Sequence, residues 1–545
     1  MLFALAWQDH AVIIVYLVGM IGLGVWLSRR QKSDADYFLG GRRMPWFAVG
    51  MSVIASLLSS LTYLSEPGEV WRAGFTNLVG KMLAIPLEVF IVWGLCIPFM
   101  MRFRFTSAYE YLEHRFNRTA RLLGVVFFIV LVVLWMGFVV LASSRALVTV
   151  SGLELWQVIF TVGIVATLYT TLGGLRAVIW TDVVQVLLLV GGGVFVIFYI
   201  AFTTGSWLPE WYANMVEHLE ASGHNQSITL FSFDPRVRTS LITVATSMCI
   251  WHICTHTSNQ MTVQRYFSTR DARAARRSFL TGTLFGVGLN LMLSLVGMAL
   301  LFYYLGEGHP LEEGLNPDVR SDQDLIFPTF AVHRLPPGFG GAILAALLAA
   351  AMSSIDSGIN SIATVVAVEA SRKEKVHHEH VSSARWLTLI GGLFITVAAY
   401  GLDFLPGDLG IMDSMPRTFN AVTAPLGGLF LVGIFLPRAG GRAAVVGAIC
   451  GLLTSIVIGY FHILVGNLVT WKVLSTSQVS EWGLLEESGK YAELSPFWVM
   501  PCALLATFLV SLLVSFIDRH DGKSLAGLTW STRHQPSPLT EKIKE

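Results

Sequence analysis

Apolar runs long enough to cross a bilayer follow one another along nearly the whole chain, with short polar breaks between them. A helix needs about 20 apolar residues to span the hydrocarbon core of a membrane. The runs predict about 13 transmembrane helices, over residues 10–28, 46–64, 76–100, 122–150, 155–172, 180–202, 239–262, 278–304, 338–368, 384–402, 409–436, 443–465 and 496–517. The pattern predicts an all-α polytopic membrane protein.

Two of these predicted helices are interrupted by polar residues. The second reads SLLSSLTYLSEPGE over residues 56–69, and the seventh reads SMCIWHICTHTSNQ over residues 247–260. Each is followed by four ordinary spans, so the core divides into two five-helix units that begin on opposite sides of the membrane. Inverted repeats with a broken first helix are typical of secondary transporters that bind their solute at mid-membrane. The alternative is that Ser and Thr residues only let helices pack closely.

This division predicts six segments along the chain. They are an N-terminal helix and inner loop (1–45), a first five-helix repeat (46–202), an external loop (203–238), a second inverted repeat (239–436), two additional helices (437–518) and a cytoplasmic tail (519–545). The Trp-containing outer loops are expected to be ordered lids or interfacial segments. The polar tail is expected to be disordered.

Composition and charge placement agree with this topology. The chain is 54% hydrophobic and 13% charged, which excludes an ordinary soluble protein. Most of its 37 Lys and Arg residues fall in loops predicted to share one side. The positive-inside rule therefore predicts an outer N-terminus and an inner C-terminus in a cytoplasmic or plasma membrane. The first run has no preceding basic residue and is followed by Arg29 and Arg30, so a signal peptide is not expected.

One predicted helix carries a carboxylate and three hydroxyls deep in its apolar run over residues 341–368. These residues are Ser353, Ser354, Asp356 and Ser357. Ala350 and the three serines share one stripe of the helix, and polar groups at that depth usually face a cavity or a ligand. Such oxygens suit a weakly held cation such as sodium. The alternative is that the serines bond back to their own helix or pack against a neighbour.

Five motifs occur together in a fixed order. They are DYFLGGR (36–42), YEYLEHRFN (109–117), LGGLRAVIWTD (172–182), NQMTVQRY (259–266) and SSIDSGINS (353–361). With them the chain resembles the sodium:solute symporter family, most of all its iodide, monocarboxylate and multivitamin carriers. The resemblance implies a leucine-transporter-like fold that imports a small solute with sodium as the coupling ion, by alternating access.

The resemblance also implies a main sodium site. By position, its ligands are the backbone carbonyls of Ala55, Leu58 and Ala350 and the hydroxyls of Ser353 and Ser354. This agrees with the polar stripe, because a broken helix leaves carbonyls free for an ion. A cage of neutral oxygens can bind and release sodium quickly.

Some family members bind a second sodium ion, and the resemblance places that site at Asp182, Asp356 and Ser357. Asp356 stands where the family has a hydroxyl residue. The carboxylate could strengthen the sodium site or make it a proton site. The alternative for Asp182 is a salt bridge with an arginine of an inner loop.

The solute positions differ from those of the bacterial galactose carrier. Most of the polar groups that bind sugar there are absent, which argues against a hexose; the matching positions are Leu57, Leu61, Thr62, His252, Gly286 and Arg417. A guanidinium pairs well with carboxylate, so an unpaired Arg417 favours a small organic anion such as a monocarboxylate. The predicted solute residues are Thr62, His252, Arg417 and Asn420. The alternative is that Arg417 is an outer anchor or gate.

Two groups of histidines resemble metal-binding sets, but neither is expected to bind a metal ion. His252, Cys254 and His256 have no acid near them in the sequence, and His377, His378 and His380 fall in a charged loop. No enzyme constellation or nucleic-acid pattern is visible. The open alternatives are a sodium–sugar symporter, a proton-coupled carrier using Asp182 and Asp356, and a transporter-fold membrane sensor. Expected partners are the solute, sodium and the bilayer, with a functional monomer.

Overall fold

A computed structural model describes residues 5–28, 34–103, 105–221, 230–232, 234–317, 319–374, 381–404, 411–485, 489–518 and 524–536. These residues form helices, with a single isolated β-bridge between Leu485 and Tyr491 and no other strand pairing in the described ranges. The helices are α1 (Trp7–Ser28), α2 (Asp34–Leu39), η1 (Gly40–Arg42), α3 (Trp46–Leu57), α4 (Ser60–Ala73), α5 (Thr76–Glu88), η2 (Val89–Cys96), α6 (Ile97–Met100), α7 (Glu110–Arg115), α8 (Arg118–Ser151), α9 (Leu155–Thr204), α10 (Leu208–Ala221), α11 (Leu241–Ser258), α12 (Gln260–Phe267), α13 (Ala272–Leu301), η3 (Phe302–Gly306), α14 (Arg320–Gln323), α15 (Ile326–His333), α16 (Phe339–Glu374), α17 (Val381–Leu402), α18 (Ile411–Arg417), α19 (Asn420–Phe435), α20 (Gly441–Gly459), α21 (Phe461–Thr470), α22 (Thr476–Glu481), η4 (Pro496–Trp498) and α23 (Val499–Ser515).

The predicted class, an all-α multi-pass membrane protein, is confirmed. Within the described residues, nine helices are long and apolar enough to cross a membrane, and the bent pair α3 and α4 makes a tenth. The count of about 13 spans stays a prediction. Two predicted spans, 155–172 and 180–202, run together as α9, which has 50 residues and is kinked at Gly174, where φ is 54°. Glycine adopts that positive φ without a steric penalty, so the two spans need no loop between them.

Both interrupted helices are broken where their polar residues lie. Helices α3 and α4 meet at an angle of 65°. The hydroxyl of Ser59 accepts a hydrogen bond from the backbone N–H of Leu61 at 3.3 Å and so caps α4. Asn259 separates α11 from α12, and its side-chain oxygen accepts the N–H of Met261 at 2.9 Å. The residues that interrupt the apolar pattern are therefore the caps of the second half-helices.

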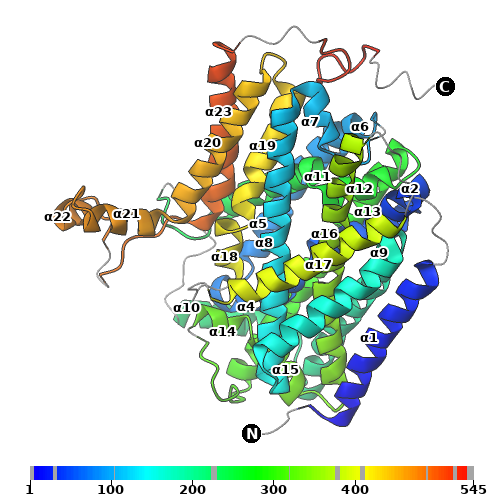
Figure 1. Ribbon diagram of the computed structural model, residues 1–545. Coiled ribbons are helices and arrows are strands. Elements are labelled where there is room, and N and C mark those ends of the chain that lie inside the picture. The colour runs from blue at the N-terminus through cyan, green and yellow to red at the C-terminus, as the bar shows by residue number, and fades with distance from the viewer. Residues whose placement is uncertain are drawn as a thin grey trace.

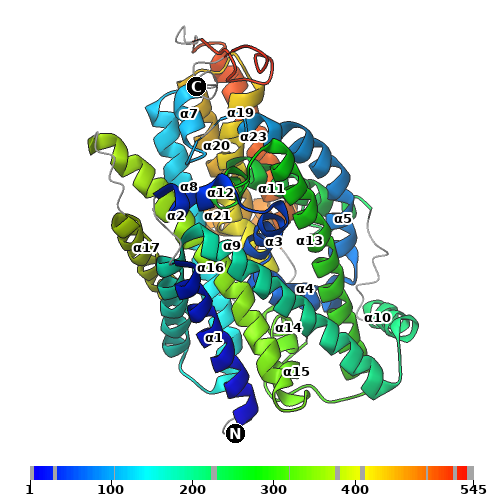
Figure 2. The ribbon, with the colours of Figure 1, turned by 90° about the vertical axis from the view of Figure 1, so that its right-hand side faces the viewer.

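Helix α16 lies at the centre of the bundle. In its most apolar window 94% of the residues are buried, against 17% for the peripheral α1. Helices α1, α9 and α17 pack around α16 on one side, while α19, α20 and α23 pack together on another (Figures 1 and 2). Helices α21 and α22 extend sideways from the bundle (Figure 1). The polar stripe of α16 is thus enclosed by protein rather than lipid.

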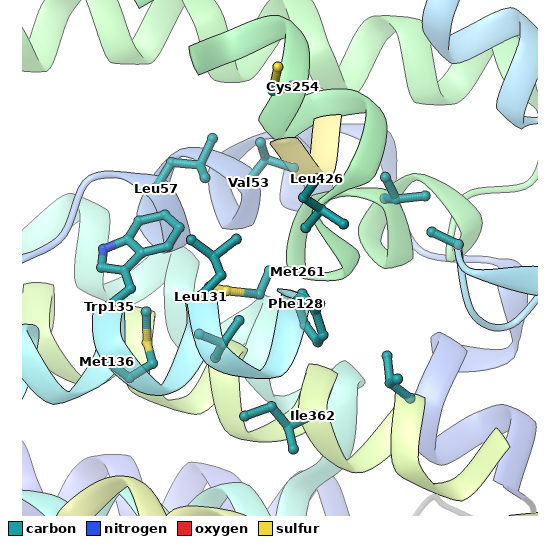
Figure 3. Close-up of a cluster of buried hydrophobic side chains, with 14 of the residues drawn as sticks. Val53, Leu57, Phe128, Leu131, Trp135, Met136, Cys254, Met261, Ile362 and Leu426 are labelled. Atoms are coloured by element: carbon teal, nitrogen blue, oxygen red, sulfur yellow. The ribbon is translucent and has the colours of Figure 1, made fainter. Parts of the chain in front are cut away.

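A buried apolar cluster holds the broken helices in place. Figure 3 shows Val53 and Leu57 of α3, Leu131 and Trp135 of α8, and Met261 of α12 in this cluster. Their burial stabilises the packing of α3, α8 and α12 against one another. The ends of the half-helices are therefore fixed by packing on several neighbours.

The segment after α23 is partly ordered, so the prediction of a disordered tail is wrong for residues 524–536. Leu528 is buried there, and its carbonyl accepts a hydrogen bond from the hydroxyl of Tyr111 at 3.0 Å. The N–H of Trp530 donates to the carbonyl of Ile434 at 2.8 Å. The physical reason is a pair of apolar side chains in an otherwise polar sequence. The rest of the predicted tail, Arg29, Arg30 and the His377, His378 and His380 group lie outside the described residues.

Candidate functional site

The polar stripe of α16 faces the end of α3. Ser353 and Ser354 are fully buried. The hydroxyl oxygen of Ser353 lies 2.9 Å from the carbonyl oxygen of Ala55 and 3.1 Å from that of Ala350. The hydroxyl oxygen of Ser354 lies 3.2 Å from the carbonyl oxygen of Ser56 and 3.4 Å from that of Ala350. Hydroxyl oxygens of α16 and carbonyl oxygens of α3 therefore lie within hydrogen-bond distance of one another.

Leu58, the remaining predicted sodium ligand, lies at the break itself. Its backbone angles are φ −91° and ψ 84°, outside the helical region, and its N–H closes the last turn of α3 with a 2.7 Å bond to the carbonyl of Ile54. Because α3 stops here, the carbonyl of Leu58 does not enter a helical hydrogen-bond ladder. The structure therefore places all five predicted oxygens on two abutting segments.

The serines of the stripe do not all face the same partner. Ser353 and Ser354 reach backbone carbonyls of α3, whereas the hydroxyl of Ser357 lies 2.8 Å from the hydroxyl of Ser56 on α3 and donates to the carbonyl of Ser353 in its own helix at 2.6 Å. All three serines therefore have a carbonyl of their own helix within reach, and Ser353 and Ser354 in addition reach carbonyls of α3.

Asp182 of α9 is paired with an arginine. Its Oδ2 accepts a hydrogen bond from the hydroxyl of Ser52 at 2.5 Å and from Nη2 of Arg265 at 3.2 Å. Arg265 also donates from Nε to Ser52 at 2.7 Å and from Nη2 to Ser357. This is the salt bridge that the sequence left open, but Arg265 belongs to the buried helix α12 and not to a loop. Oδ1 of Asp182 is buried and has no hydrogen-bond partner among the described residues.

Asp356 lies at the other end of the same network. Its Oδ2 accepts a hydrogen bond from the hydroxyl of Tyr169 at 2.9 Å, and its Oδ1 lies 3.1 Å from the hydroxyl oxygen of Ser357. Ser357 connects this carboxylate to Arg265. The structure thus brings Asp182, Asp356 and Ser357 into one buried network that also contains a guanidinium.

A cavity of about 120 Å³ opens beside the α3–α4 break. Thr62, His252 and Asn420, three of the four predicted solute residues, are in its wall. The complete lining is Ile54, Leu57, Leu58, Ser59, Thr62, Lys81, Trp135, Met248, Trp251, His252, Asn290, Met415, Phe419 and Asn420. A second cavity of about 70 Å³ adjoins it and shares several of these residues. Both cavities are mainly apolar, as solute sites usually are.

Arg417, the fourth predicted solute residue, is not in the wall of either cavity. Its Nη2 lies 2.6 Å from Oε2 of Glu493, so the premise that Arg417 is unpaired is wrong. The reason is a long-range ion pair with a residue just before α23. Nε and Nη1 of Arg417 are buried without a hydrogen-bond partner among the described residues.

The sequence reasoning missed Lys81, the lysine in the cavity wall. Its Nζ lies 2.5 Å from Oε2 of Glu66 and 3.0 Å from Oδ1 of Asn290. The signal was present, because a lysine inside the apolar span 76–100 is costly unless it has a partner or a function.

Comparisons with known proteins agree with this architecture. The model of the sodium:solute symporter family matches residues 37–451. The sodium/sialic acid symporter SiaT of Proteus mirabilis is 31% identical over 456 residues, which are 83% of this chain and 89% of that protein. The sodium-dependent multivitamin transporter of Oryctolagus cuniculus is 33% identical, over 85% of this chain and 71% of that one. The human sodium-coupled monocarboxylate transporter 1 is 32% identical, over 83% and 73%.

Solved structures give the same result. A substrate-bound, outward-open sodium-coupled sialic acid symporter superposes with a TM-score of 0.77 at 27% identity and covers 94% of this chain and 99% of its own. The nucleobase–cation symporter Mhp1, with a TM-score of 0.58 at 13% identity and coverages of 94% and 98%, shares the fold. The predicted leucine-transporter-like fold and sodium coupling are confirmed. The protein is a sodium-coupled symporter and not an enzyme, and it belongs to the sodium:solute symporter family.

Proposed function

We propose that this symporter imports a small organic anion through the 120 Å³ cavity beside the α3–α4 break. One observation carries the proposal: Leu58 belongs both to the wall of this cavity and to the predicted sodium cage. A solute and a sodium ion bound there would stabilise the same conformation of one broken helix. Each would then favour binding of the other, as coupled transport requires.

The wall suits a solute with an apolar body and a polar end. Leu57, Trp135, Trp251 and Phe419 supply apolar surface. The indole N–H of Trp251 donates to Oδ1 of Asn420 at 2.9 Å. This bond occupies the amide oxygen, so the amide NH₂ of Asn420 is oriented to donate to the solute.

We assign the solute carboxylate to Lys81 in preference to Arg417. Lys81 is in the wall and is held by neutral Asn290 as well as by Glu66, so an incoming carboxylate could replace one of these partners. Arg417 is the second candidate, because two of its nitrogens have no hydrogen-bond partner among the described residues. If Arg417 does not bind the solute, its ion pair with Glu493 is consistent with a role as an outer anchor or gate.

The relatives favour an anion of this class. By name, the similar proteins carry sialic acid and monocarboxylates with sodium, and both kinds of solute bear a carboxylate. A monocarboxylate is the finer proposal. A sodium–sugar symporter is the second candidate.

The charge of such a solute bears on stoichiometry. A sodium ion that moves inward down 100 mV and a tenfold gradient supplies about 2.3 plus 1.4 kcal/mol. Carrying a monovalent anion inward costs about 2.3 kcal/mol against the same potential. One sodium ion would therefore support about tenfold accumulation and two would support several thousandfold. We propose two sodium ions, the second at Asp182, Asp356 and Ser357.

The arrangement of basic segments supports a cytoplasmic or plasma membrane location with the N-terminus outside and the C-terminus inside. The segments around α2, α7 and α12, which contain many of the Lys and Arg residues, lie toward the same end of the bundle in Figures 1 and 2. By the positive-inside rule that end faces the cytoplasm. We propose that the protein works as a monomer, since cavity and cage lie within one chain.

Uptake into proteoliposomes tests the proposal. We expect sodium-dependent uptake of a labelled short-chain monocarboxylate or sialic acid, and no competition by hexoses. Lys81→Gln should lower anion uptake at least about thirtyfold, because a charge-assisted pair in a desolvated site is worth about 2 to 5 kcal/mol. Lys81→Arg keeps the positive charge, so it should fold like the wild type and retain more uptake than Lys81→Gln. Arg236→Gln, at an exposed ion pair, is the matched control.

The alternatives have distinct outcomes. Loss of uptake in Arg417→Gln but not in Lys81→Gln would transfer the carboxylate to Arg417. Competition by hexoses and none by carboxylates would favour the sugar symporter. Uptake driven by a proton gradient without sodium would favour the proton-coupled carrier. Binding without any uptake would indicate the membrane sensor.

A further inference from the structure

We propose that Glu88, His252 and His256 form a binding site for a divalent transition-metal ion of the Zn²⁺ class. A carboxylate oxygen and two imidazole nitrogens of these residues all lie within 4.8 Å of one another. Glu88 comes from the end of α5, and the histidines lie one turn apart on α11. The acid that the histidines lack in the sequence is thus supplied by another helix.

One of the three ligand-atom distances matches that of a metal site, and the other two are no longer than 4.8 Å. Oε1 of Glu88 lies 3.1 Å from Nδ1 of His252. Zinc bonds nitrogen and carboxylate oxygen at about 2.0 to 2.2 Å in a tetrahedron, which places its ligand atoms a little over 3 Å apart. Small side-chain rotations would therefore bring the three groups to binding distance.

The orientation of His256 also fits a ligand. Its Nδ1 lies 2.6 Å from the hydroxyl oxygen of Tyr266, so Nε2 is the nitrogen left for the metal. Histidine ligands typically have their other nitrogen held by a hydrogen bond in this way. The rings of His252 and His256 are nearly parallel, with 13° between their planes.

The surroundings leave room for an ion and favour a positive charge. All three residues line the 70 Å³ cavity, which can hold a metal ion with a bound water. The side chain of Glu88 is 2% exposed, and its one described ion-pair partner is His252. A buried carboxylate is costly without a cation. Two imidazoles and one carboxylate with an open fourth position match zinc, whereas Ca²⁺ and Mg²⁺ prefer oxygen ligands.

This site is separate from the two sodium sites, which are built on α3, α9 and α16. It ties α5 to α11, and His252 also lines the proposed solute cavity. A bound metal ion would therefore inhibit transport by joining two helices and occupying part of that wall. The inhibition rests on the proposed function, but metal binding does not.

Zn²⁺ binding to the purified full-length protein tests the site directly. In detergent, with sodium and no solute, competition with a fluorescent zinc chelator should reveal a site that Ca²⁺ and Mg²⁺ do not fill. Glu88→Gln and His256→Gln should each weaken it at least about tenfold, the lower end for loss of a metal-site group. The triple variant His377→Gln, His378→Gln and His380→Gln is the control for histidines elsewhere in the sequence, and Cys249→Ser is the control for a thiol on α11.

Unchanged Zn²⁺ affinity in Glu88→Gln and in His252→Gln, with both variants folded by thermal denaturation, would overturn the site. Loss of all binding in the triple variant would do the same. If either Glu88→Gln or His252→Gln does not fold, the Zn²⁺ affinity of the other variant tests the site. Zn²⁺ binding without inhibition of uptake would leave the metal site standing and overturn its link to the solute cavity.

Discussion

The two candidate cation sites lie on the same central helix but are built differently. The cage at Ser353 and Ser354 has neutral hydroxyls and backbone carbonyls. The network at Asp182 and Asp356 has two carboxylates and the guanidinium of Arg265. A sodium ion bound in the proposed cage would meet only dipoles, which suits release in each cycle. A sodium ion in the network would have to bind beside the guanidinium of Arg265. The ion pair of Arg265 with Asp182 joins α12 to α9, and the bond of Arg265 to Ser357 joins α12 to α16.

The largest expected effect is on the charged network. Asp182→Asn removes the negative charge that pairs with Arg265, and breaking one side of a buried ion pair typically costs about 3 to 5 kcal/mol. We expect a marked fall in the free energy of unfolding and in yield, measured by denaturation of the purified protein. The double variant Asp182→Asn, Arg265→Gln should recover part of the loss. A single variant as stable as the wild type would show that the pair does not hold the helices.

A middle-sized effect is expected in the neutral cage. Replacing Ser353 or Ser354 with Ala should raise the sodium concentration for half-maximal uptake about tenfold, the loss of one oxygen ligand worth about 1 to 1.5 kcal/mol. Stability should change little, because no buried charge is left unpaired. Ser361→Ala, a buried serine of the same helix, is the control. Unchanged sodium dependence in both variants would rule out this site.

The smallest effect concerns Asp356, which departs from the family pattern. Asp356→Ser restores a hydroxyl and should weaken sodium binding only about threefold, because a hydroxyl oxygen replaces the carboxylate oxygen and Asp182 remains, a loss of about 0.5 to 1 kcal/mol. The wild type should show a sodium Hill coefficient near two. A wild-type Hill coefficient of one at every pH tested would exclude a second sodium ion. A Hill coefficient near one in the wild type that rises toward two in Asp356→Ser would identify Asp356 as a proton site.

Local features of the fold could be predicted from the sequence, and its long-range pairs could not. The breaks were visible because Ser59 and Asn259 cap the half-helices that they begin, which is a matter of a few neighbouring residues. The pair of Asp182 with Arg265 joins residues 83 apart, and that of Arg417 with Glu493 joins residues 76 apart. Nothing in either local pattern specifies the partner. The same limit applies to Glu88 and the histidines of α11, which lie far apart in the sequence and meet only in the fold.

Residues 524–536 return to the end of α19, where the N–H of Trp530 reaches the carbonyl of Ile434. That carbonyl belongs to the last turn of α19, and the carbonyls of a last turn have no N–H partner within their own helix. A chain shortened before residue 524 would expose it to solvent, together with the hydroxyl of Tyr111. For laboratory work, a purification tag or fluorescent protein therefore belongs after residue 536. A reporter joined there leaves the hydrogen bond between Trp530 and the end of α19 intact.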